Sequence, residues 1–261
     1  MAPFPGPVRG TGPEGRDWGR GVTLDDQTMH YYRAGYFGLI NHVDTQLSRL
    51  FQYIRDARLL EDTFAVFTAD HGEMLGDHHM FAKTRALEGS ARVPFLARAP
   101  RRMGLPRQVV CDEPVGLQDV MPTLLDVAGA PIPDSVTGRS VLPFMRGEAP
   151  AWRDVLHGEH AGAYLMEHGV HFLVTSRWKY VWYSQAGPEL LFDLHADPHE
   201  LHDRATSDDL TPWRRLLIRA LRTRPEGFVA GDRLVPGRPH NKFVPGKGPE
   251  IPWQDPGWNP A

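Results

Sequence analysis

The sequence predicts an α/β fold, in which part of a helix-covered sheet is followed by a small antiparallel sheet with one packing helix. Three observations predict it. Apolar residues recur at spacings of three and four over residues 25–58, residues 63–68 form a strand that is apolar on both faces, and the runs after residue 150 are short and aromatic. A strand that is apolar on both faces is typical of the centre of a helix-covered parallel sheet, and a helix followed by such a strand is typical of α/β domains. We therefore expect an α/β part over 25–150 and an antiparallel subdomain over 151–225.

Length and composition exclude several classes of protein. The chain has 261 residues, enough to bury a sizeable core, and a net charge of -3, so no basic excess favours a nucleic acid partner. No run of 18 apolar residues predicts a membrane span, and a single cysteine, Cys111, excludes an internal disulfide and a multi-cysteine zinc site. The first residues lack the charged and apolar regions of a signal peptide, so we expect a cytoplasmic protein with no membrane partner.

The first elements are a loop and a long helix. Residues 1–24 are rich in Gly and Pro and are expected to form a loop or disordered lead. They contain a literal G-x-G-x-x-G at 10–15, but Pro13 interrupts it and no strand precedes it, which argues against a dinucleotide site. The helix is expected from Asp25 to Arg58, with acidic residues in its first turn and basic residues in its last.

The remaining elements follow from the same patterns. After the strand at 63–68, we expect strands at 93–97 and 109–111, a helix at 117–127 that Gly129 ends, and a loop at 135–147 with a short helical turn. The expected antiparallel subdomain has strands at 154–160, 170–175, 178–183 and 189–193, then an amphipathic helix at 211–222. Residues 226–261 are expected to be an extended tail.

A candidate metal site follows the first strand. Asp70 and His71 stand at its carboxyl end, where ligands bind in open α/β sheets. A carboxylate and an imidazole are ligands for divalent metals, and Gly72 allows the backbone to approach a ligand closely. A helix-capping Asp beside a solvent-facing His explains the same two residues, because a closed metal site needs three or four ligands.

Other titratable residues leave alternatives open. Lys83 is either a solvated loop charge or a group that neutralises an anionic substrate near a metal. His78 and His79 are candidate ligands, acid/base groups or ordinary loop residues, and we assign them as substrate-facing candidates. His157 and His160 lie three apart on an expected strand and so point to opposite faces, which argues against a shared metal.

One further motif has a structural interpretation. The sequence His199-Glu200-Leu201-His202 is one residue short of the zinc-protease spacing H-E-x-x-H. It is better explained as a helix start after Pro198.

The candidate residues lie in a segment that resembles a known family. Residues 67–83, FTADHGEMLGDHHMFAK, resemble the second signature region of the sulfatases in the alkaline phosphatase superfamily. Further segments resemble later parts of that family in the same order, so the resemblance covers most of residues 25–225. These segments are 36–44, 92–95, 117–125, 134–140, 178–180, 191–194 and 197–198.

The resemblance implies a sulfatase-like hydrolase that cleaves a small-molecule sulfate ester with the help of a metal. It implies one divalent ion, with calcium expected first and manganese, magnesium or zinc as alternatives. Asp70 and His71 match the family's second pair of metal ligands. Lys83 matches the lysine that contacts the sulfate or the leaving oxygen.

Two departures from the family pattern concern the nucleophile and the metal. No C/S-x-P-x-R motif, the source of the family's formylglycine, occurs in the sequence. After Cys111 the proline stands at the third following position, whereas the motif requires it at the second. The family's first acidic metal pair is also absent. We therefore expect an N-terminally truncated sulfatase, inactive by itself, with an exposed sheet edge and an exposed apolar face. The alternatives are a phosphonate monoester or phosphodiester hydrolase of the same superfamily, and a non-catalytic binding or partner module.

Overall fold

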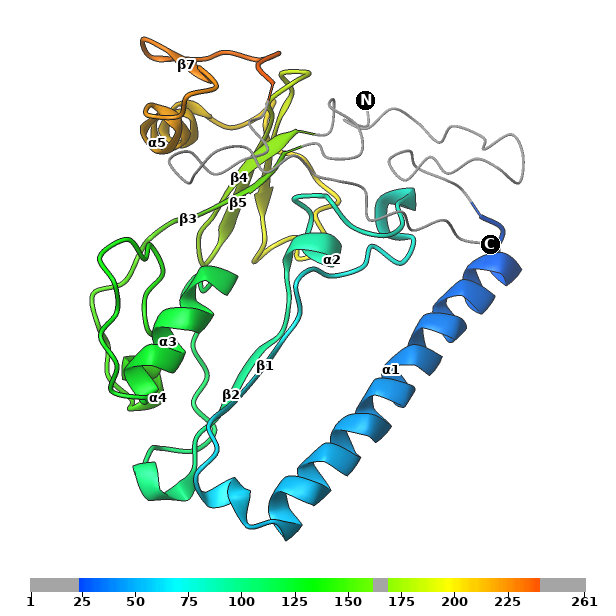
Figure 1. The fold of residues 1–261 in the computed structure, drawn as a ribbon. Coiled ribbons are helices and arrows are strands. Elements are labelled where there is room, and N and C mark those ends of the chain that lie inside the picture. Colours follow the sequence, from blue (N-terminus) through cyan, green and yellow to red (C-terminus); the bar gives the residue numbers. More distant parts are fainter. Residues whose placement is uncertain (1–23, 162–168, 240–261) are drawn as a thin grey trace, which may run out of the picture.

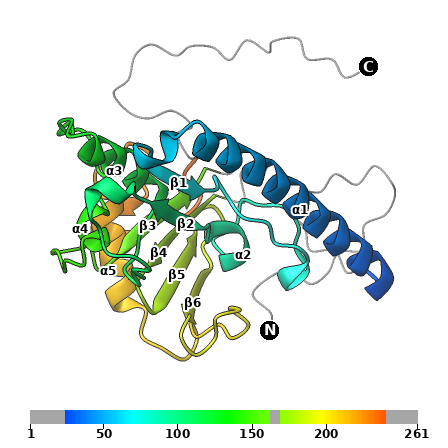
Figure 2. The same cartoon turned by 90° about the horizontal axis from the view of Figure 1, so that it is seen from below.

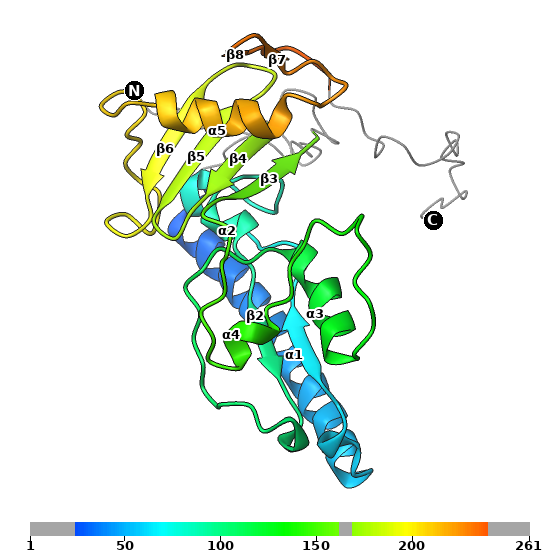
Figure 3. The same ribbon diagram turned by 90° about the vertical axis from the view of Figure 1, so that its left-hand side faces the viewer.

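A computed structural model describes residues 24–161 and 169–239, and shows two packed parts (Figure 1). In the first part, strands β1 and β2 lie between helix α1 and the pair α3–α4 (Figure 1 and Figure 2). In the second, a four-stranded sheet carries α5 on one face (Figure 3).

The helices are α1 Asp26–Asp56, α2 Glu88–Ala91, α3 Val120–Val127, α4 Leu142–Met145 and α5 Thr211–Leu221. The strands are β1 Ala65–Thr68, β2 Phe95–Arg98, β3 Leu156–His160, β4 Val170–Val174, β5 Trp178–Tyr183, β6 Glu189–Asp193, β7 Val229–Ala230 and β8 Arg233–Leu234.

The long helix α1 is confirmed, but no helix or strand among residues 24–161 and 169–239 buries its apolar face. Asp25 caps it, because its carboxylate accepts a hydrogen bond from the Thr28 backbone N–H at 2.7 Å. Within the described part of the chain no α1 residue is buried, and apolar side chains such as Leu39 and Val43 are 65% and 50% exposed. The helix contacts the loop after β1 through its first turns, where Tyr32 packs edge-on against Phe81. The periodicity therefore predicted the helix, and most of its apolar stripe is exposed within the described part of the chain.

The first sheet differs from the prediction. We expected β1 to be a central strand of a parallel sheet, buried on both faces, but it pairs only with β2 and the pairing is antiparallel, from Ala65–Arg98 to Thr68–Phe95. Phe67 on β1 and Leu96 on β2 are 43% and 63% exposed. An apolar strand is buried only when neighbours cover it, and the described residues give β1 a single strand neighbour.

The prediction of a strand at residues 109–111 is wrong. These residues form no strand, and Val110 is 82% exposed. Val109 and Val110 are β-branched, but no described strand lies beside them to pair with. A high strand propensity alone does not form a strand.

The four-stranded sheet is confirmed, in the order β3-β4-β5-β6 with every neighbouring pair antiparallel. Its side chains alternate between two cores. Tyr180, Trp182 and Leu191 pack with α5 residues and Phe228, and the intervening residues, including Val181, pack on the other face. That second face is covered by Met74, Met80, Ala86 and Leu87. The loop that follows β1 is therefore fixed in place by the hydrophobic core of the second part.

The expected tail and the expected helix start need correction. Residues 226–239 form a small hairpin of β7 and β8, and Phe228 is fully buried against the sheet, so this segment packs rather than extends. Residues 198–199 form a turn instead of a helix start. The expected loop over 1–24 falls almost entirely outside the described residues, as do residues 240–261. No helix among the described residues is long and apolar enough to cross a membrane.

Candidate active site

Asp70 and His71 lie side by side directly after β1. Oδ2 of Asp70 is 3.5 Å from Nε2 of His71, and the Asp70 side chain is 87% exposed. Nδ1 of His71 lies 2.8 Å from the carbonyl oxygen of Gly72. Because a carbonyl oxygen only accepts, this hydrogen bond requires a proton on Nδ1, so in the neutral imidazole the lone pair is on Nε2, the nitrogen that faces Asp70.

Gly72 allows a close approach, but to protein backbone rather than to a ligand. Its N–H donates to the carbonyl oxygen of Ser90 at 2.8 Å. A Cβ at this position would overlap the carbonyl oxygen of Gly89 in α2. The absence of a side chain therefore seats the Asp70–His71 turn against α2.

Glu73 closes the loop that carries Lys83. Its Oε1 accepts hydrogen bonds from the backbone N–H of Ala82 at 2.6 Å and of Leu75 at 3.2 Å, and from the Tyr32 hydroxyl at 3.2 Å. The Met74 N–H also donates to the Ala82 carbonyl at 2.9 Å. These hydrogen bonds bring Ala82, at the end of the loop, back beside Glu73 and Met74 at its beginning. Nothing in the pattern of the sequence had marked Glu73, because its partners are backbone groups up to nine residues away and a tyrosine of α1.

Asp70, His71 and Lys83 line one cavity of about 2100 Å³, between the β1–β2 part and the four-stranded sheet. This volume exceeds the range of about 300–1000 Å³ common for single-ligand pockets, so a substrate would fill only part of it. His78 and His79 do not line it. Nε2 of His78 lies 3.0 Å from the carbonyl oxygen of His199, and His79 is exposed.

Comparison with known proteins gives the family. Residues 76–224, more than half of the chain, match the family described as N-sulphoglucosamine sulphohydrolase, C-terminal, and residues 2–130 match the family described as Sulfatase. The chain belongs to the sulfatase family.

Relatives of this sulfatase chain are longer than it is. It is 40% identical to the arylsulfatase of Clostridium perfringens over 221 residues, 83% of the chain and 45% of the relative. It is 35% identical to arylsulfatase K of Gallus gallus over 188 residues, 67% of the chain and 34% of the relative. The chain thus spans less than half the length of these relatives.

Solved structures agree on the fold. A phosphonate monoester hydrolase from Silicibacter pomeroyi superposes with a TM-score of 0.67 at 33% identity, covering 78% of this chain and 42% of that one. A putative sulfatase from Bacteroides thetaiotaomicron superposes with a TM-score of 0.71 at 22% identity, covering 88% and 53%. The second likeness is one of fold alone.

The sulfatase chain also buries an ion cluster that sequence reasoning missed. Nζ of Lys179, on β5, lies 2.5 Å from Oε1 of Glu88 and 2.8 Å from Oε1 of Glu200. Lys179 is 1% exposed, and burial raises the pKa of Glu200 despite the attraction of the ammonium. The Glu88 backbone N–H donates to the other oxygen of Glu200 at 2.6 Å. The cluster joins α2, on which the Asp70–His71 turn rests, to the sheet.

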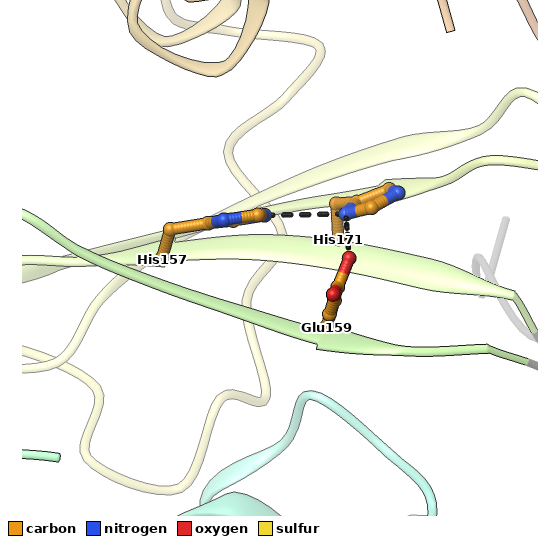
Figure 4. Close-up of side chains that lie close together, drawn as sticks. All are labelled: His157, Glu159 and His171. Atoms are coloured by element: carbon orange, nitrogen blue, oxygen red, sulfur yellow. Dashed lines mark hydrogen bonds and ion pairs between the residues drawn. The ribbon is translucent and has the colours of Figure 1, made fainter. Parts of the chain in front are cut away.

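A second polar cluster lies on the sheet itself. His157 and Glu159 of β3 meet His171 of β4 (Figure 4). The sequence correctly separated His157 from His160, which does not join this cluster, but it missed His171. The signal that could have found His171 is the cross-strand register, which pairs it with Glu159.

Proposed function

We propose that Asp70, His71 and Lys83 supply one part of the active site of a metal-dependent sulfuric ester hydrolase. The observation that carries the proposal is the convergence of a carboxylate, an imidazole with a directed lone pair and an ammonium on one cavity, in a chain of the sulfatase family. The cavity wall draws on both the 25–150 and the 151–225 parts, which we propose as the two functional units.

The two ligand candidates fit one divalent ion. Two ligands bonded to a calcium ion at about 2.3–2.6 Å and about 90° apart lie about 3.3–3.7 Å from each other, and the two atoms here are 3.5 Å apart. When bound, such an ion stabilises negative charge that develops on the ester. The resemblance implies calcium, and the imidazole ligand makes manganese and zinc the nearest alternatives.

The side chains of this chain have separate roles in the proposed reaction. Asp70 and His71 hold the ion, and the hydrogen bond from His71 to Gly72 keeps the imidazole oriented. Lys83 places its positive charge on the sulfate or the leaving oxygen. Cys111 also lines the cavity, and partial desolvation raises the pKa of its thiol, which lowers its thiolate fraction. We propose that the nucleophile comes from residues beyond these 261.

One experiment tests the activity and its rival. The segment of the Clostridium perfringens arylsulfatase that precedes its matched region is fused to this chain, and this chimeric enzyme is assayed on a sulfate ester, a phosphonate monoester and a phosphodiester with the same aryl leaving group. We expect the highest kcat/KM on the sulfate ester.

The other outcomes are equally informative. A preference for the phosphonate monoester would favour the alternative suggested by the 33% identical hydrolase structure. A folded chimera that turns over none of the three esters would favour a binding module instead. The chain without the added segment serves as the background control.

A further inference from the structure

Three metal-binding side chains converge on one face of the four-stranded sheet. His157 and Glu159 are two residues apart on β3 and so share a face, and the register places His171 of β4 directly opposite Glu159. Nδ1 of His171 is 3.2 Å from Nε2 of His157 and 3.3 Å from Oε2 of Glu159 (Figure 4). All three ligand atoms lie within 4.8 Å of one another.

These separations suit a tetrahedral ion. Two ligands bonded at about 2.0–2.1 Å to a tetrahedral zinc lie about 3.3 Å apart, and two of the three separations already have that value. The third closes by rotation of the His157 ring or the Glu159 carboxylate, both of which are less buried than His171. Two imidazoles and one carboxylate form a zinc donor set that leaves a fourth position open.

The charges around the cluster leave one carboxylate oxygen for a cation. Nη1 of Arg224 binds Oε1 of Glu159 at 3.0 Å, whereas Oε2 faces His171. Arg224 also pairs with Glu226 at 2.8 Å, and the Glu226 side chain is only 2% exposed. The arginine charge is therefore matched by a second carboxylate, and the arginine orients Glu159 as an outer partner orients a metal ligand.

The surroundings fix one ligand and expose the others. His171 is fully buried, stacked on Trp182 at 5.9 Å between ring centroids and edge-on to Phe228 at 4.9 Å. His157 and Glu159 line the large cavity, whereas His171 does not. Glu159 is exposed, so water can reach the cluster from the Glu159 side.

We propose that His157, Glu159 and His171 form a second metal site, of the zinc type, with one coordination position left open. The site uses none of the residues of the Asp70–His71 pair, so it does not depend on the proposed sulfatase function. Its ligand class is a divalent ion that prefers nitrogen donors, zinc before calcium or magnesium.

The test uses the full chain carrying Asp70→Ala and His71→Ala, so that binding at the first site does not contribute. The chain is stripped with a chelator and titrated with Co²⁺, which reports tetrahedral nitrogen coordination by its visible absorption, and then with Zn²⁺. We expect one Zn²⁺ per chain. In the same background, His157→Ala and Glu159→Gln are each expected to weaken Zn²⁺ binding by about a hundredfold or more, because even outer partners of a ligand are worth about 10–100-fold.

The matched control is His160→Ala, on the same strand but outside the cluster, and it should bind Zn²⁺ like its parent. His171 is left intact because it is fully buried and its removal would disturb the core. Circular dichroism of each variant shows that it is folded. Absence of Zn²⁺ binding in the stripped parent, or equal binding by folded parent and His157→Ala, would overturn the proposal and leave the trio a hydrogen-bonded cluster.

Discussion

Replacing Asp70 by Ala in the chimeric enzyme is expected to lower kcat/KM for the sulfate ester by about 10³-fold or more. A metal that stabilises developing charge is worth several kcal/mol, and each 1.36 kcal/mol is a factor of ten in rate. Lys83→Ala is expected to cost about 10²–10³-fold, the usual effect of removing one preorganised stabiliser of negative charge. Steady-state kinetics with added metal measure both effects.

The control for these two variants is His79→Ala. His79 belongs to the same loop, but it is exposed and does not line the cavity. Its replacement should change kcat/KM by no more than about threefold, the range of a surface substitution. A loss at His79 equal to that at Lys83 would show that the loop acts through its fold rather than through Lys83.

The largest expected effect on stability is at Asp119, which is fully buried at the start of α3. Its two oxygens bind the guanidinium of Arg153 at 2.6 and 2.7 Å and accept the backbone N–H groups of Gly116 at 2.9 Å and Arg139 at 2.8 Å. Asp119→Ala leaves a half-buried arginine and two N–H groups without these partners. Because breaking a buried pair costs about 3–5 kcal/mol, we expect a loss of that size in the free energy of unfolding.

Urea denaturation measures that loss, with Asp112→Ala as the control. Asp112 is exposed on the preceding loop, and its replacement should change stability by no more than about 0.5 kcal/mol. A cost at Asp119 below about 1 kcal/mol would mean that the bidentate pair contributes little beyond its own desolvation.

The elements that the sequence predicted well have strong local periodicity. The α1 pattern repeats over 31 residues, and the short aromatic and β-branched runs of β4 to β6 predicted the strands that divide two cores. Asp70 and His71 were chosen as candidates because they follow a strand directly. Lys83 was assigned through the family resemblance, since a loop lysine carries no pattern of its own.

The features that the sequence missed depend on neighbours in space. The pairing of β1 with β2 joins residues about 30 positions apart, and no periodicity encodes its direction. Lys179, Glu88 and Glu200 come from three separate segments, and His171 meets Glu159 only through register. A local sequence pattern predicts on which face of a helix or strand a side chain lies, but not which residues of other segments pack against it.

The central claim is that Asp70, His71 and Lys83 act on one ion and one sulfate. A crystal structure of the chimeric enzyme with Mn²⁺ and sulfate tests it most directly, because the anomalous signal locates the metal. We predict Mn²⁺ bonded to the Asp70 carboxylate and Nε2 of His71 at about 2.0–2.3 Å, with Nζ of Lys83 within hydrogen-bond distance of the sulfate. Mn²⁺ bound without either residue, or Lys83 turned away from the sulfate, would contradict the account.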